Sequence, residues 1–381
     1  MADADLLQFH AFCLTDTGTR LHQYERALAA TVRPGDVVLD LGTGAGLLAL
    51  LACRAGASLV HAVESSDATQ LAELLVGASG VADRIRIVRL RSSRLTLADR
   101  VDVVVADIHD TFGLEAGGLA TLFDARDRLL KPGGILVPRA VRLVVAPAEA
   151  PRLYARDIDV WRTRVAGVDL SPLRPLSVNH VHATRFEPGD LLAPPIELTS
   201  VDLRSATGRL LAGEVQATIA RAGTLHGVCG AFVTTLADDV TLSNVPGDSG
   251  TSNFAQALFP IEEPVRVSTG DRVGMALDTL DGEVARWRIE VRGVDGTPRA
   301  RFEHSTLQTM PLSPATLRRR DQDYRPGLTG LGAVERALLD RIDGRTPAAE
   351  LEAWLAAHFS DLLPSRREAA AFLRTAIDRW G

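Results

Sequence analysis

Apolar and helical stretches alternate along the first 140 residues of the chain. Short apolar runs, each followed by a stretch of helical periodicity, predict strands over residues 36–41, 59–64, 85–90, 101–107 and 133–138. Repeated strand–helix units of this length are typical of a parallel, doubly wound α/β sheet of the Rossmann-like type. Ligands of such sheets bind outside the carboxyl ends of the strands. Three of these ends, residues 40–46, 64–66 and 107–110, are therefore expected to converge on one site.

The pattern changes after Pro138. Short β-rich segments separated by turn signals run from about residue 140 to residue 300, and this spacing predicts an antiparallel sandwich or β-barrel. The periodicity then becomes helical again, with Val334, Leu338 and Leu339 on one stripe. The sequence thus predicts an N-terminal helix with a Rossmann-like domain over 1–139, a β-barrel substrate domain over 140–300, and a small helical C-terminal appendage over 301–381.

A helix is expected just before the first strand, over residues 8–30. Tyr24, Ala27 and Leu28 share one apolar face of this helix, beside the polar Arg20. A helix in this position can cover a ligand at the end of the first strand, and an arginine on it can hold a carboxylate with two hydrogen bonds. A helix that serves only for packing fits the same spacing equally well.

Composition restricts the classes of partner. The 381 residues carry a net charge of −6, without the basic footprint expected of a nucleic-acid-binding domain. Cys13, Cys53 and Cys229 are scattered, so neither a metal site nor a disulfide framework is expected, and a reducing, cytoplasmic location fits. The chain begins without a signal-peptide pattern and contains no apolar run long enough to span a membrane, so no membrane partner is expected.

A glycine-rich turn follows the first strand. Gly42, Gly44 and Gly46 come directly after Asp40, and Glu64 ends the next apolar run, 24 residues after Asp40. Glycines let a ligand lie against the backbone and the following helix N-terminus, while a carboxylate after the second strand can bind both hydroxyls of a ribose. The pattern is typical of the S-adenosylmethionine (SAM) site of class I methyltransferases. The alternative is a tight turn without a ligand.

A nucleotide fold followed by a β-barrel resembles the protein arginine methyltransferases. The stretches that carry this resemblance are Leu14-x-Asp16 with Arg20-x3-Tyr24-x2-Ala27-Leu28, residues 38–46 with Glu64, residues 124–130, residues 133–138 and residues 154–161. The likeness covers about residues 10 to 293. The family dimerises through an arm inserted in the barrel, and the resemblance implies a homodimer with this arm near residues 168–194.

The resemblance also implies a role for each residue at the cofactor site. Arg20 would hold the methionine carboxylate of SAM, the three glycines would line the cofactor, and Asp40 would support their loop. Glu64, with Ser65 beside it, would bind the ribose hydroxyls. Adenine would lie near Ser92, where the family has an acidic residue.

The acceptor region departs from the family. The family holds a guanidinium between two glutamates on a loop after the fourth strand. Here the first becomes Asp107, and the second falls on Ala116, with Glu115 one residue early. The family's Thr-His-Trp loop maps onto residues 252–254, Ser-Asn-Phe, so its histidine is absent.

A histidine stands beside the first of these acids. His109 lies between Asp107 and Asp110, where it could act as a general base near neutral pH while the two acids fix its tautomer. The alternative is a loop histidine satisfied by backbone groups, with the aspartates as helix caps. On the first interpretation, Asp107, His109 and Glu115 are the candidate catalytic residues.

The sequence therefore predicts a SAM-dependent methyltransferase that acts on a side chain of a peptide or protein. A ribosomally made natural-product peptide is one such substrate, and the helical appendage could then dock a leader peptide or a partner. Arginine, histidine, carboxylate and amide acceptors all stay open at this point. Two other functions also stay open: a small-molecule methyltransferase, and a catalytically silent SAM-binding scaffold that regulates a partner.

Overall fold

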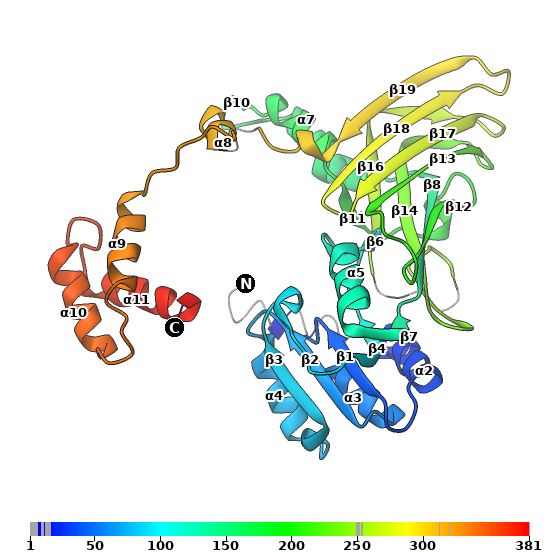
Figure 1. The fold of residues 1–381 in the computed structure, drawn as a ribbon. Helices are drawn as coiled ribbons and strands as arrows, with labels where there is room; N and C mark the ends of the chain where they lie inside the picture. Colours follow the sequence, from blue (N-terminus) through cyan, green and yellow to red (C-terminus); the bar gives the residue numbers. More distant parts are fainter. Residues whose placement is uncertain are drawn as a thin grey trace. The chain divides into compact units, whose positions relative to one another are not determined.

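A computed structural model describes residues 7, 8, 11, 17–248, 252, 254–311, 313–319 and 321–380 of the chain (Figure 1). Cys13 and the motif residues Leu14, Asp16 and Asn253 lie outside these described residues. Contacts divide the chain into two compact units, Met1–Met310 and Pro311–Gly381.

The first unit begins with a parallel sheet in the strand order β3-β2-β1-β4-β7. Its strands are β1 (Val37–Leu41), β2 (Leu59–Glu64), β3 (Ile85–Arg89), β4 (Val101–Ala106) and β7 (Leu130–Val137). Its main helices are α2 (His22–Thr31), α3 (Leu47–Ala55), α4 (Ala68–Gly77) and α5 (Gly118–Leu129). The predicted doubly wound sheet is confirmed. Its strand order reverses between β1 and β4, which is where such sheets bind their ligands.

Two antiparallel sheets follow, and they confirm the predicted β-rich domain. The first has the order β11-β16-β14-β8-β12, with β15 paired to β14, and the second has the order β13-β17-β18-β19. The strands are β8 (Ala140–Ala148), β11 (His182–Thr184), β12 (Ile196–Asp202), β13 (Leu210–Thr218), β14 (Gly223–Ala237), β15 (Val240–Ser243), β16 (Gln256–Val267), β17 (Arg272–Leu280), β18 (Val284–Arg292) and β19 (Pro298–Ser305). Apolar side chains from both sheets, including Phe259, Met275 and Trp287, share one core.

The two antiparallel sheets approach closely at Gly213. A Cβ on Gly213 would lie 2.2 Å from the carbonyl oxygen of Leu198, so only glycine fits where β13 passes β12. This approach connects the sheets along one side of their common core, and we call the domain the barrel.

The barrel packs directly against the parallel sheet. Tyr24 on α2, Leu39 on β1 and Phe232 on β14 belong to one continuous apolar cluster and are all fully buried. Figure 1 shows α5 between the parallel sheet and the barrel strands. The carboxyl ends of β1 and β4 are therefore held against the barrel by a shared core.

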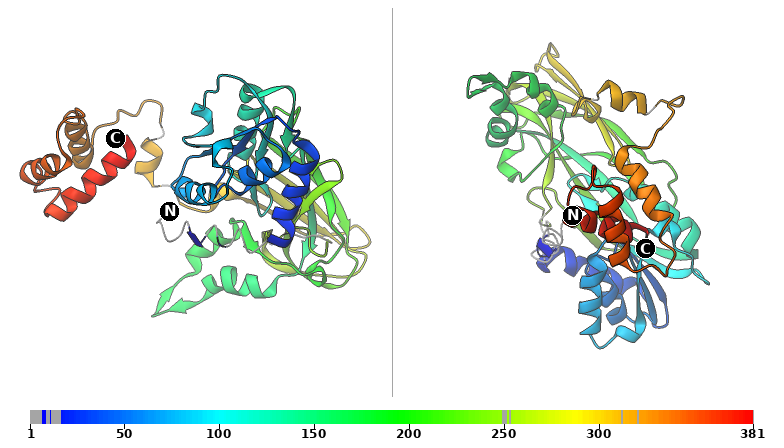
Figure 2. Two further views of the ribbon diagram at one scale, coloured as in Figure 1. Left: turned by 90° about the horizontal axis from the view of Figure 1, so that it is seen from below. Right: turned by 90° about the vertical axis from the view of Figure 1, so that its left-hand side faces the viewer.

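An excursion leaves the barrel between β8 and β11. It contains α6 (Pro151–Leu153), the turns η4 (Tyr154–Ile158), η5 (Asp159–Arg162) and η6 (Ser171–Leu173), a hairpin of β9 (Arg164–Val165) and β10 (Val168–Asp169), and α7 (Arg174–Val178). Figure 2 shows it as the green segment that projects from the barrel. The sequence predicts the arm over residues 168–194. The hairpin already begins at Arg164, and β11, which lies within the predicted range, belongs to the barrel sheet.

The second unit is helical. It contains α8 (Pro314–Arg319), α9 (Gly330–Leu339), α10 (Ala348–His358) and α11 (Arg366–Trp380). Val334, Leu338, Leu351, Leu355 and Leu373 form the centre of its own small core. Strand β19 runs to Ser305, beyond residue 300, so these helices begin later than the predicted boundary. Within the described part of the chain, no helix is both long and apolar enough to cross a membrane.

Candidate functional site

The glycine turn after β1 forms one wall of the site. Gly42, Gly44 and Gly46 have φ angles of 74°, 54° and 85°, a region in which residues with a Cβ are strained. Gly46 also faces Ala72 on α4, where an added Cβ would lie 3.3 Å from the Ala72 Cβ. The turn therefore depends on glycine both for its conformation and for its packing.

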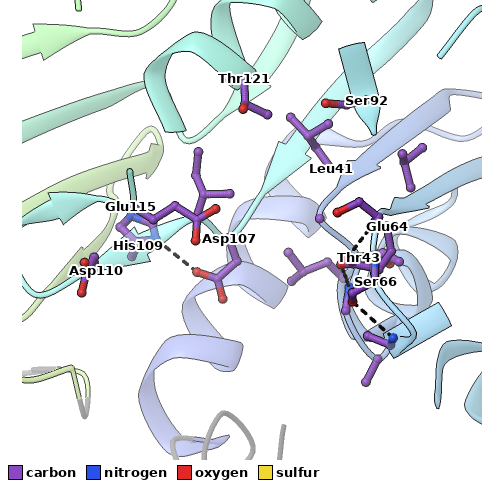
Figure 3. A pocket seen from close by; sticks show the side chains of 18 of the residues that line it. Leu41, Thr43, Glu64, Ser66, Ser92, Asp107, His109, Asp110, Glu115 and Thr121 are labelled. Atoms are coloured by element: carbon purple, nitrogen blue, oxygen red, sulfur yellow. Dashed lines mark hydrogen bonds and ion pairs between the residues drawn. The ribbon is translucent and has the colours of Figure 1, made fainter. Parts of the chain in front are cut away.

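Glu64 lies against this turn at the end of β2. Its Oε2 accepts a hydrogen bond from the amide of Gly44 at 3.2 Å, and its Oε1 accepts from the amides of Ser65 and Ser66 at 2.8 Å (Figure 3). The ends of β1 and β2 are thus joined through one carboxylate. A carboxylate in this place is well suited to bind a ribose diol.

Asp40 supports the turn from behind. Its side chain is buried, and one oxygen accepts a hydrogen bond from the hydroxyl of Thr43. The other oxygen makes no hydrogen bond of good geometry, although the nearby amide of Ala49 at the start of α3 lowers the pKa of the carboxyl. Burial outweighs both hydrogen-bonding groups and raises the pKa of Asp40 to about 7.

A cavity of about 910 Å³ opens in front of the turn. Two of the candidate cofactor residues, Asp40 and Gly46, are buried and do not line it. The other candidate cofactor and catalytic residues do line it: Arg20, Gly42, Gly44, Glu64, Ser65, Ser92, Asp107, His109 and Glu115. Thr43 and Asp124, which lie within the stretches that carry the family resemblance, also line it, as does Thr121, which no sequence signal marked. The glycine turn, the Glu64 carboxylate and the nearby Arg20 guanidinium match the backbone contacts, diol acceptor and carboxylate clamp that SAM requires. The chain's own residues therefore fit this cofactor.

The loop after β4 is a tight hairpin. Strands β5 (His109–Asp110) and β6 (Gly113–Leu114) pair with each other, and the amide of Glu115 donates to the carbonyl of Ile108 at 2.9 Å. The barrel holds its tip, because the Asn244 side-chain amide donates to the Thr111 carbonyl at 2.9 Å. Asp107 and Glu115 thus stand at the two ends of one short hairpin.

Asp107 is held by a cation and a histidine. Arg20 Nη1 donates to its Oδ2 at 2.7 Å. Nδ1 of His109 lies 3.1 Å from its Oδ1 (Figure 3). Burial alone would raise the pKa of the Asp107 carboxyl, but the hydrogen bond from His109 and the charge of Arg20 outweigh it and lower that pKa below its usual value. Asp107 is therefore an ionised carboxylate.

His109 has both ring nitrogens occupied. Its side chain has no exposed surface, its ring stacks on Phe232 at 5.1 Å, and its Nε2 lies 2.9 Å from the hydroxyl of Thr234 on β14. A carboxylate can only accept, so Nδ1 carries the hydrogen toward Asp107 and Nε2 accepts from Thr234. With both ring nitrogens engaged, by Asp107 and by Thr234, this geometry favours a positioning role for His109 over the general-base hypothesis. It fits a residue that positions Asp107.

Glu115 faces other carboxylates. Burial of its carboxyl raises its pKa, although the residue as a whole is exposed, and the nearby charges of Asp110, Asp107 and Glu64 raise it further. Figure 3 shows the Glu115 and Asp107 side chains on the same side of the hairpin. The mouth of the cavity is therefore strongly negative.

Of the two described residues 252 and 254, Phe254 lines the cavity. Its ring lies 5.6 Å from the Arg20 guanidinium and contacts Phe232 edge-on at 5.8 Å. Phe254 therefore forms the part of the cavity wall beside Arg20.

The residues that fix the hairpin carried no sequence signal. Thr234 follows His109 by 125 residues, and Asn244 follows Thr111 by 133. Neither belongs to a recognisable motif, and each reaches the hairpin only because the barrel packs against the parallel sheet.

Known families match both halves of the first unit. Residues 19–138 match the family described as ribosomal protein L11 methyltransferase, and residues 140–290 match the arginine methyltransferase oligomerization subdomain. The chain is 30% identical over 284 residues to "Protein arginine N-methyltransferase 6" of Xenopus laevis, covering 70% of this chain and 83% of that protein. It is also 30% identical over 293 residues to "Arginine N(omega)-methyltransferase" of Streptomyces achromogenes subsp. streptozoticus, covering 74% of this chain and 78% of that one.

Solved structures share the fold of the first unit. The Trypanosoma brucei PRMT1 enzyme–prozyme heterotetrameric complex with AdoHcy superposes with a TM-score of 0.69 at 22% identity, covering 78% of this chain and 97% of the other. Arabidopsis thaliana protein arginine methyltransferase 10 gives a TM-score of 0.65 at 21% identity, covering 76% of this chain and 95% of the other.

Proposed function

The chain belongs to the protein arginine methyltransferase family and is a SAM-dependent methyltransferase, and from this premise we propose that its acceptor is the guanidinium of an arginine in a peptide or protein. The observation that carries the proposal is the pair of carboxylates, Asp107 and Glu115, at the mouth of the cofactor cavity. A guanidinium is planar and permanently charged, and two carboxylates can hold it by its fork of donors.

The two carboxylates have different environments and hence different roles. Asp107, with its lowered pKa, stays ionised and orients the guanidinium through charge and hydrogen bonding. Glu115, with its raised pKa, is the stronger base of the two and takes the proton that the attacking nitrogen loses. Bound SAM supplies an electrophilic methyl group on a sulfonium, and the new nitrogen–carbon bond forms as the carbon–sulfur bond breaks.

Arg20, Glu64 and the glycine turn are proposed to hold the cofactor. Arg20 binds the methionine carboxylate, Glu64 with Ser65 binds the ribose, and Ser92 lies on the adenine side. Their contribution is alignment, because an in-line displacement needs nitrogen, methyl carbon and sulfur held on one axis.

The charge of the cavity favours an arginine inside a polypeptide over free arginine. The α-carboxylate of free arginine needs a cation, but the described lining beside the hairpin is acidic, and its nearest cation, Arg20, is paired with Asp107. Free arginine is a second candidate, because a relative of similar length carries the name arginine N(omega)-methyltransferase.

The test is incubation with methyl-labelled SAM and matched acceptors. A peptide with one arginine is compared with the same peptide carrying lysine or citrulline instead, and with free arginine. We expect a mass gain of one methyl group on the arginine peptide alone, lost in Asp107→Asn and Glu115→Gln. Methylation of free arginine alone would favour the second candidate. SAM binding without transfer to either acceptor would contradict the proposal and favour a silent scaffold or another acceptor.

We further propose a homodimer. Residues 140–290 match an oligomerization subdomain, and the excursion between β8 and β11 exposes several apolar side chains: Val160, Val165, Val168 and Leu173. Exposed apolar residues grouped on one projecting segment are typical of a surface that pairs with another chain.

A further inference from the structure

A turn of the barrel caps the helix that follows the acceptor hairpin. The turn between β17 and β18 carries Asp281, whose side chain has no exposed surface. Its Oδ1 accepts from the amide of Leu119 at 2.8 Å and its Oδ2 from the amide of Ala120 at 3.1 Å. Its main-chain carbonyl accepts from the amide of Gly117 at 2.9 Å. Three amides at the start of α5 are thus bound by one barrel residue.

Helix α5 has no cap of its own. Its N-cap residue, Gly117, has a φ of 80° and no side chain, and its first turn contains no acidic residue. The first amides of a helix need acceptors, and a carboxylate there also interacts favourably with the helix dipole. Asp281, which follows Leu119 by 162 positions, supplies both the hydrogen-bond acceptors and the negative charge.

The turn itself is fixed in place. Asp281 has a φ of 50°, a conformation that costs energy for a residue with a Cβ and that persists only where the surroundings enforce it. Its amide donates to the carbonyl of Arg209 at 2.9 Å. A Cβ on Gly282 would lie 3.0 Å from the amide nitrogen of Ala116, so the turn touches the chain directly after Glu115.

We propose that Asp281 is a positioning residue that sets the place of Glu115 in the acceptor site. The hairpin that carries Glu115 is held at its tip by Asn244, and Asp281 fixes its exit into α5. Both holding groups come from the barrel, so the barrel determines where the second carboxylate stands relative to Asp107. This inference rests on the proposed role of Glu115 at the acceptor.

The proposal distinguishes the acceptor site from the cofactor site. The proposed cofactor contacts are made by Arg20, the glycine turn, Glu64 with Ser65, and Ser92. The hydrogen bonds of Asp281 go to none of these residues, although Ala120, whose amide Asp281 binds, lines the same cavity. A shift of Glu115 by a fraction of an ångström therefore lowers turnover with the acceptor but leaves SAM binding unchanged. If Asp281 were only a structural cap, its loss would lower the stability of the fold, and acceptor turnover and SAM binding would then fall together.

The test compares Asp281→Asn and Asp281→Ala with the matched control Asp278→Asn. Asp278 lies three residues earlier near the same turn, and its carboxylate pairs with Arg286 instead of with α5. We expect Asp281→Ala to lower kcat/KM for the acceptor by about ten- to one-hundredfold, with Asp281→Asn intermediate because it keeps one acceptor oxygen. The SAM Kd should change by less than about twofold in both, and Asp278→Asn should behave as wild type.

A second variant guards against loss of folding. Gly282→Ala keeps the Asp281 carboxylate but adds a Cβ at a φ of 71° and 3.0 Å from the amide nitrogen of Ala116, so it displaces the turn and should give the same selective loss with the acceptor, with its Tm measured alongside. The inference is overturned if Asp281→Ala acts as wild type, or if acceptor kinetics, SAM binding and Tm all fall together in both variants. The assay uses whichever acceptor the wild-type protein methylates, so failure on arginine would count against the proposed function and not against this inference.

Discussion

The guanidinium of Arg20 donates a hydrogen bond at 2.7 Å to the carboxylate of Asp107, which lies 87 positions later in the sequence. Arg20 is the residue proposed to hold the carboxylate of SAM, and Asp107 is proposed to orient the acceptor. Both side chains are largely buried, at 13% and 17% exposure, so solvent screens this pair only weakly. The cofactor and acceptor sites therefore share one ion pair.

Substituting one or the other member of this pair should affect acceptor methylation and SAM binding differently. We expect Asp107→Asn to lower kcat by about one-hundredfold or more, because a neutral amide cannot orient and stabilise a guanidinium as a carboxylate does. SAM binding, measured by calorimetry, should be retained, because Arg20 then loses a competing carboxylate. Arg20→Ala should instead weaken SAM binding. If Asp107→Asn abolished SAM binding, Asp107 would belong to the cofactor site.

His109 should act through Asp107 and not on the substrate. His109→Phe keeps a ring against Phe232 but removes the hydrogen bond to Asp107, and we expect kcat to fall by about tenfold with an unchanged SAM Kd. The acidic limb of the pH–rate profile should remain. Thr234→Val removes only the hydroxyl that donates to His109 and should give a smaller loss in the same direction. Disappearance of that limb in His109→Phe would instead support the general-base hypothesis.

The cofactor half of this site could be predicted from the sequence because its determinants are local. The glycines, Asp40 and Glu64 lie on one strand–turn–helix–strand unit, β1 to β2, whose geometry follows from spacing alone. The state of His109 could not be predicted, because it depends on Thr234 and on packing from a domain more than a hundred residues away. The same holds for the cap that Asp281 provides to α5, since a turn in a β-hairpin carries no sign of the helix that it will meet.

The activity should fall at acidic pH through protonation of Glu115. Its pKa is raised above the usual value of 4.5 by burial and then by the neighbouring carboxylate of Asp110, so the acidic limb of kcat/KM should lie above that pH. Asp110→Asn removes one negative neighbour and lowers the pKa of Glu115, which should move the limb to lower pH. The control Asp99→Asn, an exposed aspartate outside the cavity lining, should leave the profile in place. A shift to higher pH in Asp110→Asn would contradict the assignment.

Asp40 should make stability depend on pH. Its pKa rises from 3.8 to about 7 on folding, so the folded protein binds this proton more tightly than the unfolded chain does. Its stabilising contribution is complete below about pH 4 and is lost as the pH rises toward 7, by about 4 kcal/mol at most. In denaturant unfolding without added cofactor, Asp40→Asn should flatten this dependence. Asp99→Asn should not, and an unchanged slope in Asp40→Asn would contradict the raised pKa.

The excursion between β8 and β11 should control the oligomeric state. Val165 and Val168 are 58% and 60% exposed on its hairpin, and aspartate at both positions would place unpaired charges in any interface that covers them. We expect the wild-type protein to be a dimer by light scattering and Val165→Asp/Val168→Asp to be a monomer with an unchanged Tm. Val294→Asp, at a position 70% exposed beyond the end of β18, is the matched control and should remain a dimer. A monomeric wild type, or a double variant that still dimerises, would place the interface elsewhere.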